Sequence, residues 1–195
     1  MLLHASRRAA ARAAPAARRG AQRLQTRPPS GPDYFALTEC ERRFDLDLTA
    51  LHERYKSFMV QIHPDKLARR PADEQQELAS RAATLTQAVG VLRDPAQRAK
   101  HLLELHGRPL GEEATGESVG APFLAQMLDA REAVEEAKSE AELHRLDRDN
   151  DALVQTLSAA LAGAFARRDL DEASRLTAQL QYLQRIGAEI RQRRE

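Results

Sequence analysis

The sequence predicts an all-α protein, and three observations support that prediction. The 195 residues include no Trp, three Tyr and five Phe, while helix-favouring Ala, Leu, Glu, Arg and Gln dominate the composition. Several segments carry apolar residues at the three- and four-residue spacing of an amphipathic helix. No stretch approaches the roughly 20 apolar residues that cross a bilayer, so we expect no contact with a membrane.

The first long helix is expected over residues 48–62, with Asp47 as its N-cap. Its buried face should consist of Leu48, Leu51, Tyr55, Phe58, Met59 and Ile62. Pro64 cannot continue the helix, and it biases His63 away from the α-helical region. The chain must therefore leave the helix there and present the imidazole of His63 and the carboxylate of Asp65 on a loop.

A second strong helix begins after Pro71, which suits a first helical turn. Its buried stripe should be Leu78, Ala82, Leu85, Val89 and Leu92. Asp94-Pro95 ends this helix, and a further helix over 96–106 stops at Gly107. A short helix is expected near Asp33–Leu37. The two long helices should form an antiparallel hairpin, against which the short helix and the helix over 96–106 pack.

Residues 107–120 are rich in Gly and Pro and mark a domain boundary. Three further helices follow. Their expected spines are Phe123, Met127, Ala130, Val134 and Ala137, then Leu143, Leu146, Leu153, Leu157, Ala160 and Ala164, then Ala173, Leu176, Leu180, Leu183 and Ile190. Ser139 with Glu142 forms a capping box, and Asp169 repeats that signal. Short connections between three helices predict an antiparallel bundle.

The charge is unevenly distributed along the chain. Residues 1–32 have a net charge of +7 with no acidic residue, residues 33–110 have a net charge of 0, and residues 111–195 have a net charge of −6. An Arg- and Ala-rich, acid-free leader predicts a cleaved mitochondrial transit peptide over residues 1–30 and a location in the mitochondrial matrix. The alternative is a basic tail that binds nucleic acid. The acidic remainder of the chain argues against a nucleic-acid partner.

Several segments with specific order and spacing carry a resemblance to known proteins. They are Asp33-Tyr34-Phe35-Ala36-Leu37, His63-Pro64-Asp65, Lys66-Leu67, Thr86-Gln87-Ala88, Leu92-Arg93-Asp94-Pro95, Arg98-Ala99 and His101-Leu102-Leu103-Glu104-Leu105-His106-Gly107. From about residue 33 to the C-terminus the chain resembles the HscB family, the J-domain co-chaperones of iron–sulfur cluster biogenesis. The resemblance implies an L-shaped protein with a J-domain (33–106), a linker (107–120) and a three-helix scaffold-binding domain (121–195).

The family uses its His-Pro-Asp loop to dock on a DnaK-type chaperone, here the mitochondrial one, and to stimulate its ATPase. The implied chaperone-binding residues are His63, Pro64, Asp65, Arg54, Lys56 and Lys66. Asp65 would pair with an arginine-bearing surface of the chaperone, and the basic residues would meet an acidic surface. A plain interhelical turn is the alternative for the tripeptide, and a solvated helix face is the alternative for Lys56.

The family uses the helix after Pro122 to bind an iron–sulfur scaffold protein of the ISCU type. The implied scaffold-binding residues are Leu124, Leu128, Asp129, Glu132, Glu136 and Tyr182. Leu124 and Leu128 remain on a neighbouring stripe once the expected core is assigned, although a wide core face would explain them equally. Ala125 departs from the family, in which a larger apolar residue stands at this position.

The resemblance implies a co-chaperone that delivers the scaffold to the chaperone and promotes cluster transfer, not an enzyme. Cys40 is the sole cysteine and should be a partly buried small residue, so we expect no metal site and no cofactor. The alternatives are a general J-protein that delivers unfolded clients and a structural helical adaptor. The sequence leaves open a weak homodimer, the chaperone paralogue and the cleavage site.

Overall fold

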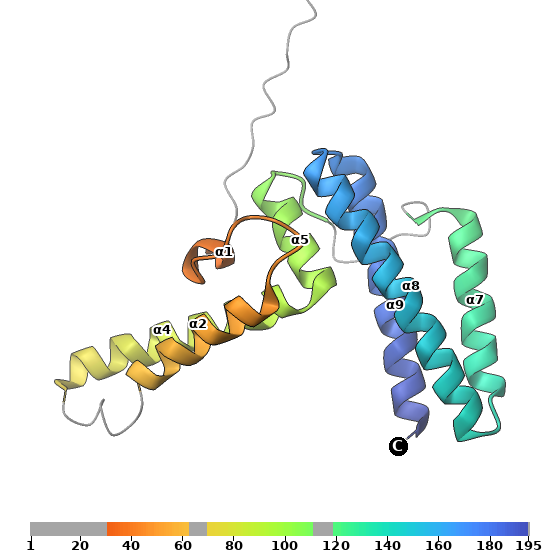
Figure 1. Cartoon of the computed structure of the whole chain (residues 1–195), viewed down its shortest axis with the longest axis horizontal. Coiled ribbons are helices and arrows are strands. Elements are labelled where there is room, and N and C mark those ends of the chain that lie inside the picture. Colours follow the sequence, from red (N-terminus) through yellow and green to blue (C-terminus); the bar gives the residue numbers. More distant parts are fainter. Residues whose placement is uncertain (1–30, 63–69, 111–118, 195) are drawn as a thin grey trace, which may run out of the picture.

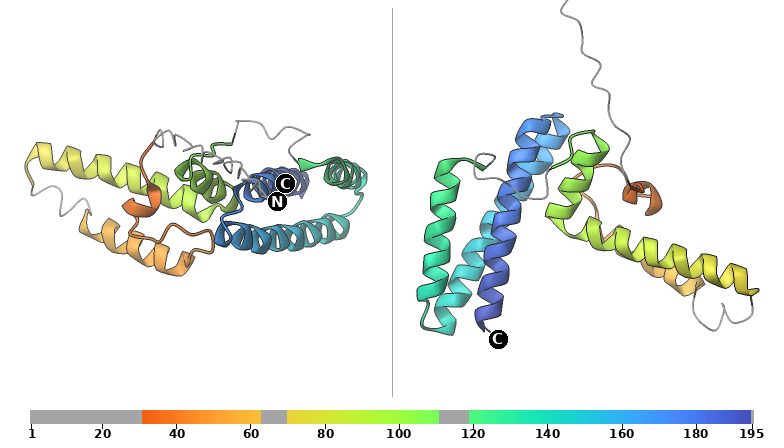
Figure 2. Two further views of the ribbon diagram at one scale, coloured as in Figure 1. Left: turned by 90° about the horizontal axis from the view of Figure 1, so that it is seen from above. Right: turned by 180° about the vertical axis from the view of Figure 1, so that it is seen from behind.

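The computed structural model describes residues 31–62, 70–110 and 119–194, and these form an all-helical molecule with two arms (Figure 1). The helices are α1 (Tyr34–Leu37), α2 (Leu48–Gln61), α4 (Ala72–Arg93), α5 (Pro95–Leu105), α7 (Ala121–Glu136), α8 (Glu140–Ala166) and α9 (Leu170–Arg194). One arm is the hairpin of α2 and α4, and the other is the bundle of α7, α8 and α9. The arms meet at α5, which confirms the predicted L shape, as the two further views also show (Figure 2).

Local capping interactions determine where the helices begin. The side chain of Asp47 accepts hydrogen bonds from the backbone N–H groups of Thr49 and Ala50, as predicted. Ser139 Oγ accepts from the N–H of Glu142, while the Glu142 carboxylate accepts from the N–H of Lys138. The predicted capping box therefore forms, although its return bond reaches one residue further back than expected.

Asp94 ends α4 and starts α5. Its carboxylate accepts a hydrogen bond from the N–H of Gln97, and Pro95 occupies the first turn of α5. At the other end of α5, Gly107 has a φ of 74°, a left-handed conformation that favours glycine. Both predicted helix boundaries are confirmed. Pro71, expected in the first turn of α4, instead occupies the N-cap position.

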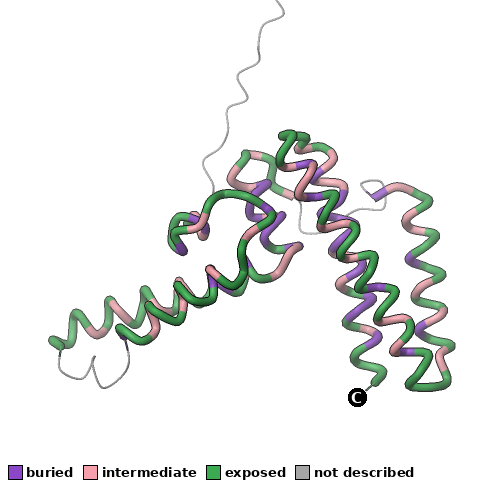
Figure 3. The backbone as a smooth tube through the Cα atoms, in the orientation of Figure 1, coloured by how far each residue is buried: buried purple, intermediate pink, exposed green. Residues whose placement is uncertain are grey.

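The predicted buried faces are correct in outline and wrong at three positions. Leu48, the first residue of α2, is 43% exposed. Leu153 is 37% exposed and Ala160 is also exposed on α8. The spines of α7 and α9 are buried or partly buried as expected (Figure 3).

The core is continuous across the junction between the two arms. Phe35, Phe44 and Leu51 belong to the same buried cluster as Leu161 and Leu180 of the bundle. Helix α5, with Leu102 and Leu103 fully buried, packs directly on α9. The two arms therefore share one buried cluster at their junction. A second cluster, which includes Met127 and Leu183, lies within the bundle.

Polar contacts also cross this junction. Gln184 of α9 donates from Nε2 to the carboxylate of Asp94, 3.1 Å away. Arg98 of α5 is buried, its Nη1 donates to the carbonyl oxygen of Leu92 at 2.6 Å, and its guanidinium lies 4.7 Å from the centre of the Phe44 ring. Burial lowers the pKa of Arg98, which Asp94 partly offsets. These contacts fix the orientation of α5 relative to both arms.

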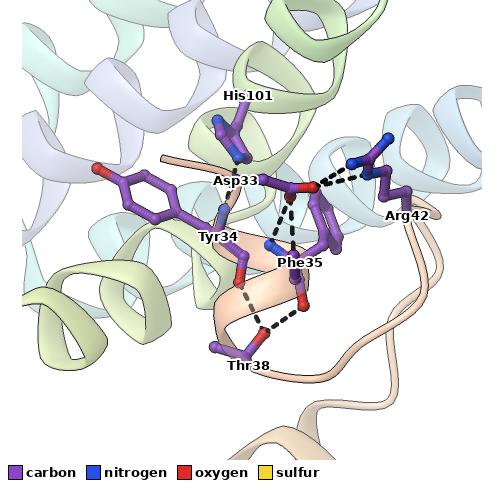
Figure 4. Close-up of polar contacts among 7 residues, drawn as sticks. Asp33, Tyr34, Phe35, Thr38, Arg42 and His101 are labelled. Atoms are coloured by element: carbon purple, nitrogen blue, oxygen red, sulfur yellow. Dashed lines mark hydrogen bonds and ion pairs between the residues drawn. The ribbon is translucent and has the colours of Figure 1, made fainter. Parts of the chain in front are cut away.

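The short helix α1 is held against α5 by a buried histidine (Figure 4). His101 Nε2 accepts a hydrogen bond from the backbone N–H of Tyr34 at 3.1 Å, so this nitrogen must be unprotonated. The His101 ring stacks on Phe35, with ring centres 5.8 Å apart. Asp33 caps α1 and pairs with Arg42, whose Nε lies 2.7 Å from the carboxylate. Burial lowers the pKa of His101, and Glu104 and Asp33 partly offset this.

His101 should make folding stability sensitive to acid. Its pKa in the folded state lies below the unfolded value of about 6.5, so its contribution is complete above that value and is lost as the pH falls through the folded pKa. We expect His101→Gln to lower the free energy of unfolding at pH 7.5 by roughly 1 kcal/mol through lost ring stacking. The same variant should lose less stability than the parent between pH 7.5 and pH 5.

Urea unfolding at several pH values, with His52→Gln as the control, measures this difference. His52 is an exposed histidine of α2, so its replacement should not alter how the free energy of unfolding changes with pH. The same loss of unfolding free energy between pH 7.5 and pH 5 in the parent and in His101→Gln would contradict the role given to His101. His106, whose pKa is also lowered by burial, contributes in the same direction to all three proteins and does not affect the comparison.

Candidate functional site

The candidate chaperone-binding residues can be located only through the helices that precede and follow them in the sequence. His63, Pro64, Asp65 and Lys66 fall outside the described residues. The segments that flank them are described: α2 ends at Gln61, Ile62 is buried, and α4 begins at Ala72. Both of these helix ends lie at the tip of the arm, far from the bundle (Figure 1). The structure thus places the flanks of the tripeptide at a protruding end.

The two predicted basic contacts on α2 have different surroundings. Arg54 Nη1 donates to the backbone oxygens of Glu39 and Thr38 and lies 3.4 Å from Sγ of Cys40. It therefore supports the end of α1. Lys56 is exposed and lies about 160° from Arg54 around the helix, at about 100° per residue. Arg54 thus has a structural contact within the chain, and both Arg54 and Lys56 stay predicted contacts for the chaperone.

The candidate scaffold-binding residues come together on the bundle. Leu124, Leu128 and Tyr182 line one groove between α7 and α9, with a volume of about 130 Å³. Leu128 is 67% exposed, which excludes the wide-core interpretation for this residue. Leu124 is half-buried. Tyr182 is also half-buried and packs against Phe123 with ring centres 6.3 Å apart. These residues give the groove an apolar floor, on which Leu128 is open to solvent.

The predicted carboxylates lie beside this groove and do not line it. Asp129, Glu132 and Glu136 are exposed on α7. At about 100° per residue, Glu132 is about 40° from Leu128 on the side away from α9. The three carboxylates therefore form an acidic flank along the outer edge of the apolar groove.

Sequence reasoning missed the charged residues that do line the groove. These are Arg131, Arg185 and Glu189. Arg131 and Glu189 form an ion pair of 3.2 Å between α7 and α9, and the Arg185 guanidinium lies 5.6 Å from the centre of the Tyr182 ring. The available signal was spacing, because Arg131 and Arg185 each follow a groove residue by three positions, Leu128 and Tyr182 respectively.

The described residues offer little for other chemistry. Among them, no group of three or more His, Cys, Asp or Glu side chains is placed to hold a metal ion. Within the same residues, no helix is long and apolar enough to cross a membrane. Cys40 is partly buried, as predicted. The described residues thus form an all-helical protein of two arms, with an open groove on the bundle arm.

Comparisons with known proteins identify the family. Residues 121–191 match the model described as the HSCB C-terminal oligomerisation domain. The chain is 34% identical over 164 residues to a co-chaperone protein HscB homolog of Paraburkholderia phymatum, covering 80% of this chain and 91% of the relative. A homolog from Neisseria meningitidis is 32% identical over 161 residues, covering 80% and 96%. The chain belongs to the HscB family of co-chaperones.

Solved structures agree with this assignment. The crystal structure of human co-chaperone protein HscB superposes with a TM-score of 0.77 at 27% identity, covering 86% of this chain and 84% of the human chain. Chaperone HscB from Vibrio cholerae gives a TM-score of 0.72 at 24% identity, covering 84% and 98%, and supports the fold alone. The predicted architecture, a J-domain joined to a C-terminal helical domain, is confirmed.

Proposed function

We propose that this co-chaperone binds an iron–sulfur cluster scaffold protein of the ISCU type and delivers it to a DnaK-type chaperone, whose ATPase it stimulates. The observation that carries the proposal is the assembly of Leu124, Leu128 and Tyr182 around one open groove. These residues are up to 58 positions apart in the sequence, and they line the groove together on the bundle of α7, α8 and α9. Residues 33–106 would serve the chaperone and residues 121–195 the scaffold.

The continuous core supports a coupling of the two sites. Because both arms contribute to one buried cluster through α5 and α9, a bound scaffold would be held at a set distance from the chaperone-binding tip. Tethering raises the effective concentration of the scaffold at the chaperone. ATP hydrolysis would then lock the chaperone on the scaffold and promote cluster release.

The proposal is tested by single-turnover ATP hydrolysis of a purified DnaK-type chaperone. We expect this protein alone to accelerate hydrolysis and the apo scaffold to accelerate it further when both are present. A permanently unfolded client should not replace the scaffold. Equal acceleration by the unfolded client would favour a general J-protein.

We further propose that residues 1–30 form a mitochondrial transit peptide and that the protein works in the matrix. Support comes from the seven arginines and the absence of acidic residues in this leader. Deleting residues 1–28 should abolish import into isolated mitochondria and leave scaffold affinity unchanged, because the groove lies more than 90 residues downstream. Import of the truncated protein at the parental rate would refute the assignment.

A further inference from the structure

The apolar groove between α7 and α9 has two edges of different charge. Its outer edge on α7 carries Glu132 and Glu136, both exposed. Its inner edge carries Arg131, Arg185 and Glu189. Arg131 lies about 60° from Leu128 toward α9, opposite to Glu132, at about 100° per residue. The apolar floor therefore separates an acidic edge from an edge that contains two arginines.

Among the described residues, no ion pair compensates one of the two positive charges on the inner edge. Glu189 pairs with Arg131 at 3.2 Å and offsets its charge. Arg185 is exposed, and none of the ion pairs found between described residues includes it. The charge that remains on this edge of the groove is that of Arg185.

The position of Arg185 suits a carboxylate. Its guanidinium lies over the Tyr182 ring at 5.6 Å from the ring centre, an arrangement that uses one face of the planar group. Stacking leaves the in-plane N–H donors available, and these donors match a carboxylate in a bidentate pair. Because the ring already restrains the long side chain, less conformational entropy is lost when a ligand binds.

We propose that Arg185 is a specificity-determining contact that receives a carboxylate of the bound scaffold and sets the orientation of the scaffold in the groove. The inference rests on the proposed function of the groove and names the chemistry of its occupant: an apolar segment with an acidic side chain on its α9-facing edge. Basic groups on the opposite edge of the same segment would face Glu132 and Glu136. Reversing the segment would place like charges together on both edges.

Calorimetry with the purified apo scaffold tests this contact. Arg185→Glu should weaken binding at least tenfold at low salt, and the loss should shrink at high salt because the contact is at the rim of the groove. Arg148→Glu, an exposed charge reversal on the outer face of α8, is the matched control and should change the affinity less than twofold. An unchanged affinity for Arg185→Glu would overturn the inference.

A second variant separates specificity from structure. Glu189→Gln removes the carboxylate that pairs with Arg131, so it should strengthen the binding of an acidic partner, opposite in sign to Arg185→Glu. Weaker binding by both variants would indicate a structural role and overturn the inference. Lysine substitution of scaffold surface carboxylates, one at a time, should identify one scaffold variant whose affinity for Arg185→Glu recovers, and failure of every such variant would contradict the contact.

Two outcomes distinguish this inference from the proposed function itself. If Leu124→Ala with Leu128→Ala weakens binding and Arg185→Glu does not, the groove holds the scaffold and the charged contact is wrong. If neither the leucine variant nor Arg185→Glu weakens scaffold binding, the scaffold binds elsewhere. The proposed function of the groove and the contact of Arg185 are then both wrong. Light scattering of the same proteins detects a second copy of the chain as the occupant; an effect of Arg185→Glu on self-association in place of scaffold affinity would overturn the inference.

Discussion

Replacing Asp65 by Asn should abolish stimulation of the chaperone ATPase and leave the fold intact. The family resemblance assigns this carboxylate to a charge pair with the chaperone. Loss of one partner from a desolvated interfacial pair costs about 2–5 kcal/mol, so stimulation at a fixed concentration should fall by at least about thirtyfold. Single-turnover ATP hydrolysis measures the effect, and His63→Gln should reproduce it.

Two controls test whether the loss of stimulation comes from unfolding or from the removal of any surface carboxylate. The melting temperature of Asp65→Asn should stay within roughly 1–2 °C of that of the parent, because surface substitutions usually change stability little. Asp151→Asn, the same chemical change at an exposed position of α8, should retain full stimulation. Full stimulation by a folded Asp65→Asn protein would show that the hairpin does not work as a J-domain.

Replacing Leu124, Leu128 and Tyr182 together by Ala should weaken scaffold binding by at least tenfold. A fully buried large apolar side chain contributes roughly 1.5–3 kcal/mol, and about 1.4 kcal/mol corresponds to a tenfold change in affinity. Leu128 should account for much of the loss, because at 67% exposure it has the most surface left to bury. Calorimetry with the apo scaffold measures the affinity.

The same triple variant should keep its basal stimulation of the chaperone, since the groove lies on the bundle and the tripeptide follows α2 of the other arm in the sequence. The two arms are separate in the structure (Figure 1). Tyr182 also packs against Phe123, so circular dichroism must first show that the bundle is folded. The double variant of Leu124 and Leu128 without Tyr182 serves where the triple variant unfolds. A folded variant with parental scaffold affinity would contradict the proposal that the groove binds the scaffold.

Local signals in the sequence predicted the helix boundaries well. Asp47, Asp94 and Gly107 end or start helices as expected, because each acts on backbone groups within three or four residues of itself. The periodic spines of α7 and α9 were equally accurate. Such patterns depend on helical geometry alone, and that geometry is the same in any tertiary context.

Distant contacts decided what the patterns left open. The sequence did not predict that Arg54 hydrogen-bonds to the backbone oxygen of Glu39, 15 residues earlier in the chain. Leu153 continues the apolar spine of α8 in sequence but is more than a third exposed. The spacing of apolar residues predicts which face of a helix is apolar, but it does not show how much of that face another helix covers. The inner edge of the groove was missed for the same reason, since Arg131 and Arg185 come from different helices.

The sequence by itself determined the all-α class, the places where helices begin and end, and the family with its His-Pro-Asp tripeptide. The tertiary structure alone decided that both arms contribute to one buried cluster at their junction, that Leu124, Leu128 and Tyr182 line one groove, and that an arginine stacked on Tyr182 borders it. The physical reason is the range of the interactions. Caps and helical periodicity act over about four residues, whereas a groove between two helices depends on how side chains 50 or more residues apart pack together.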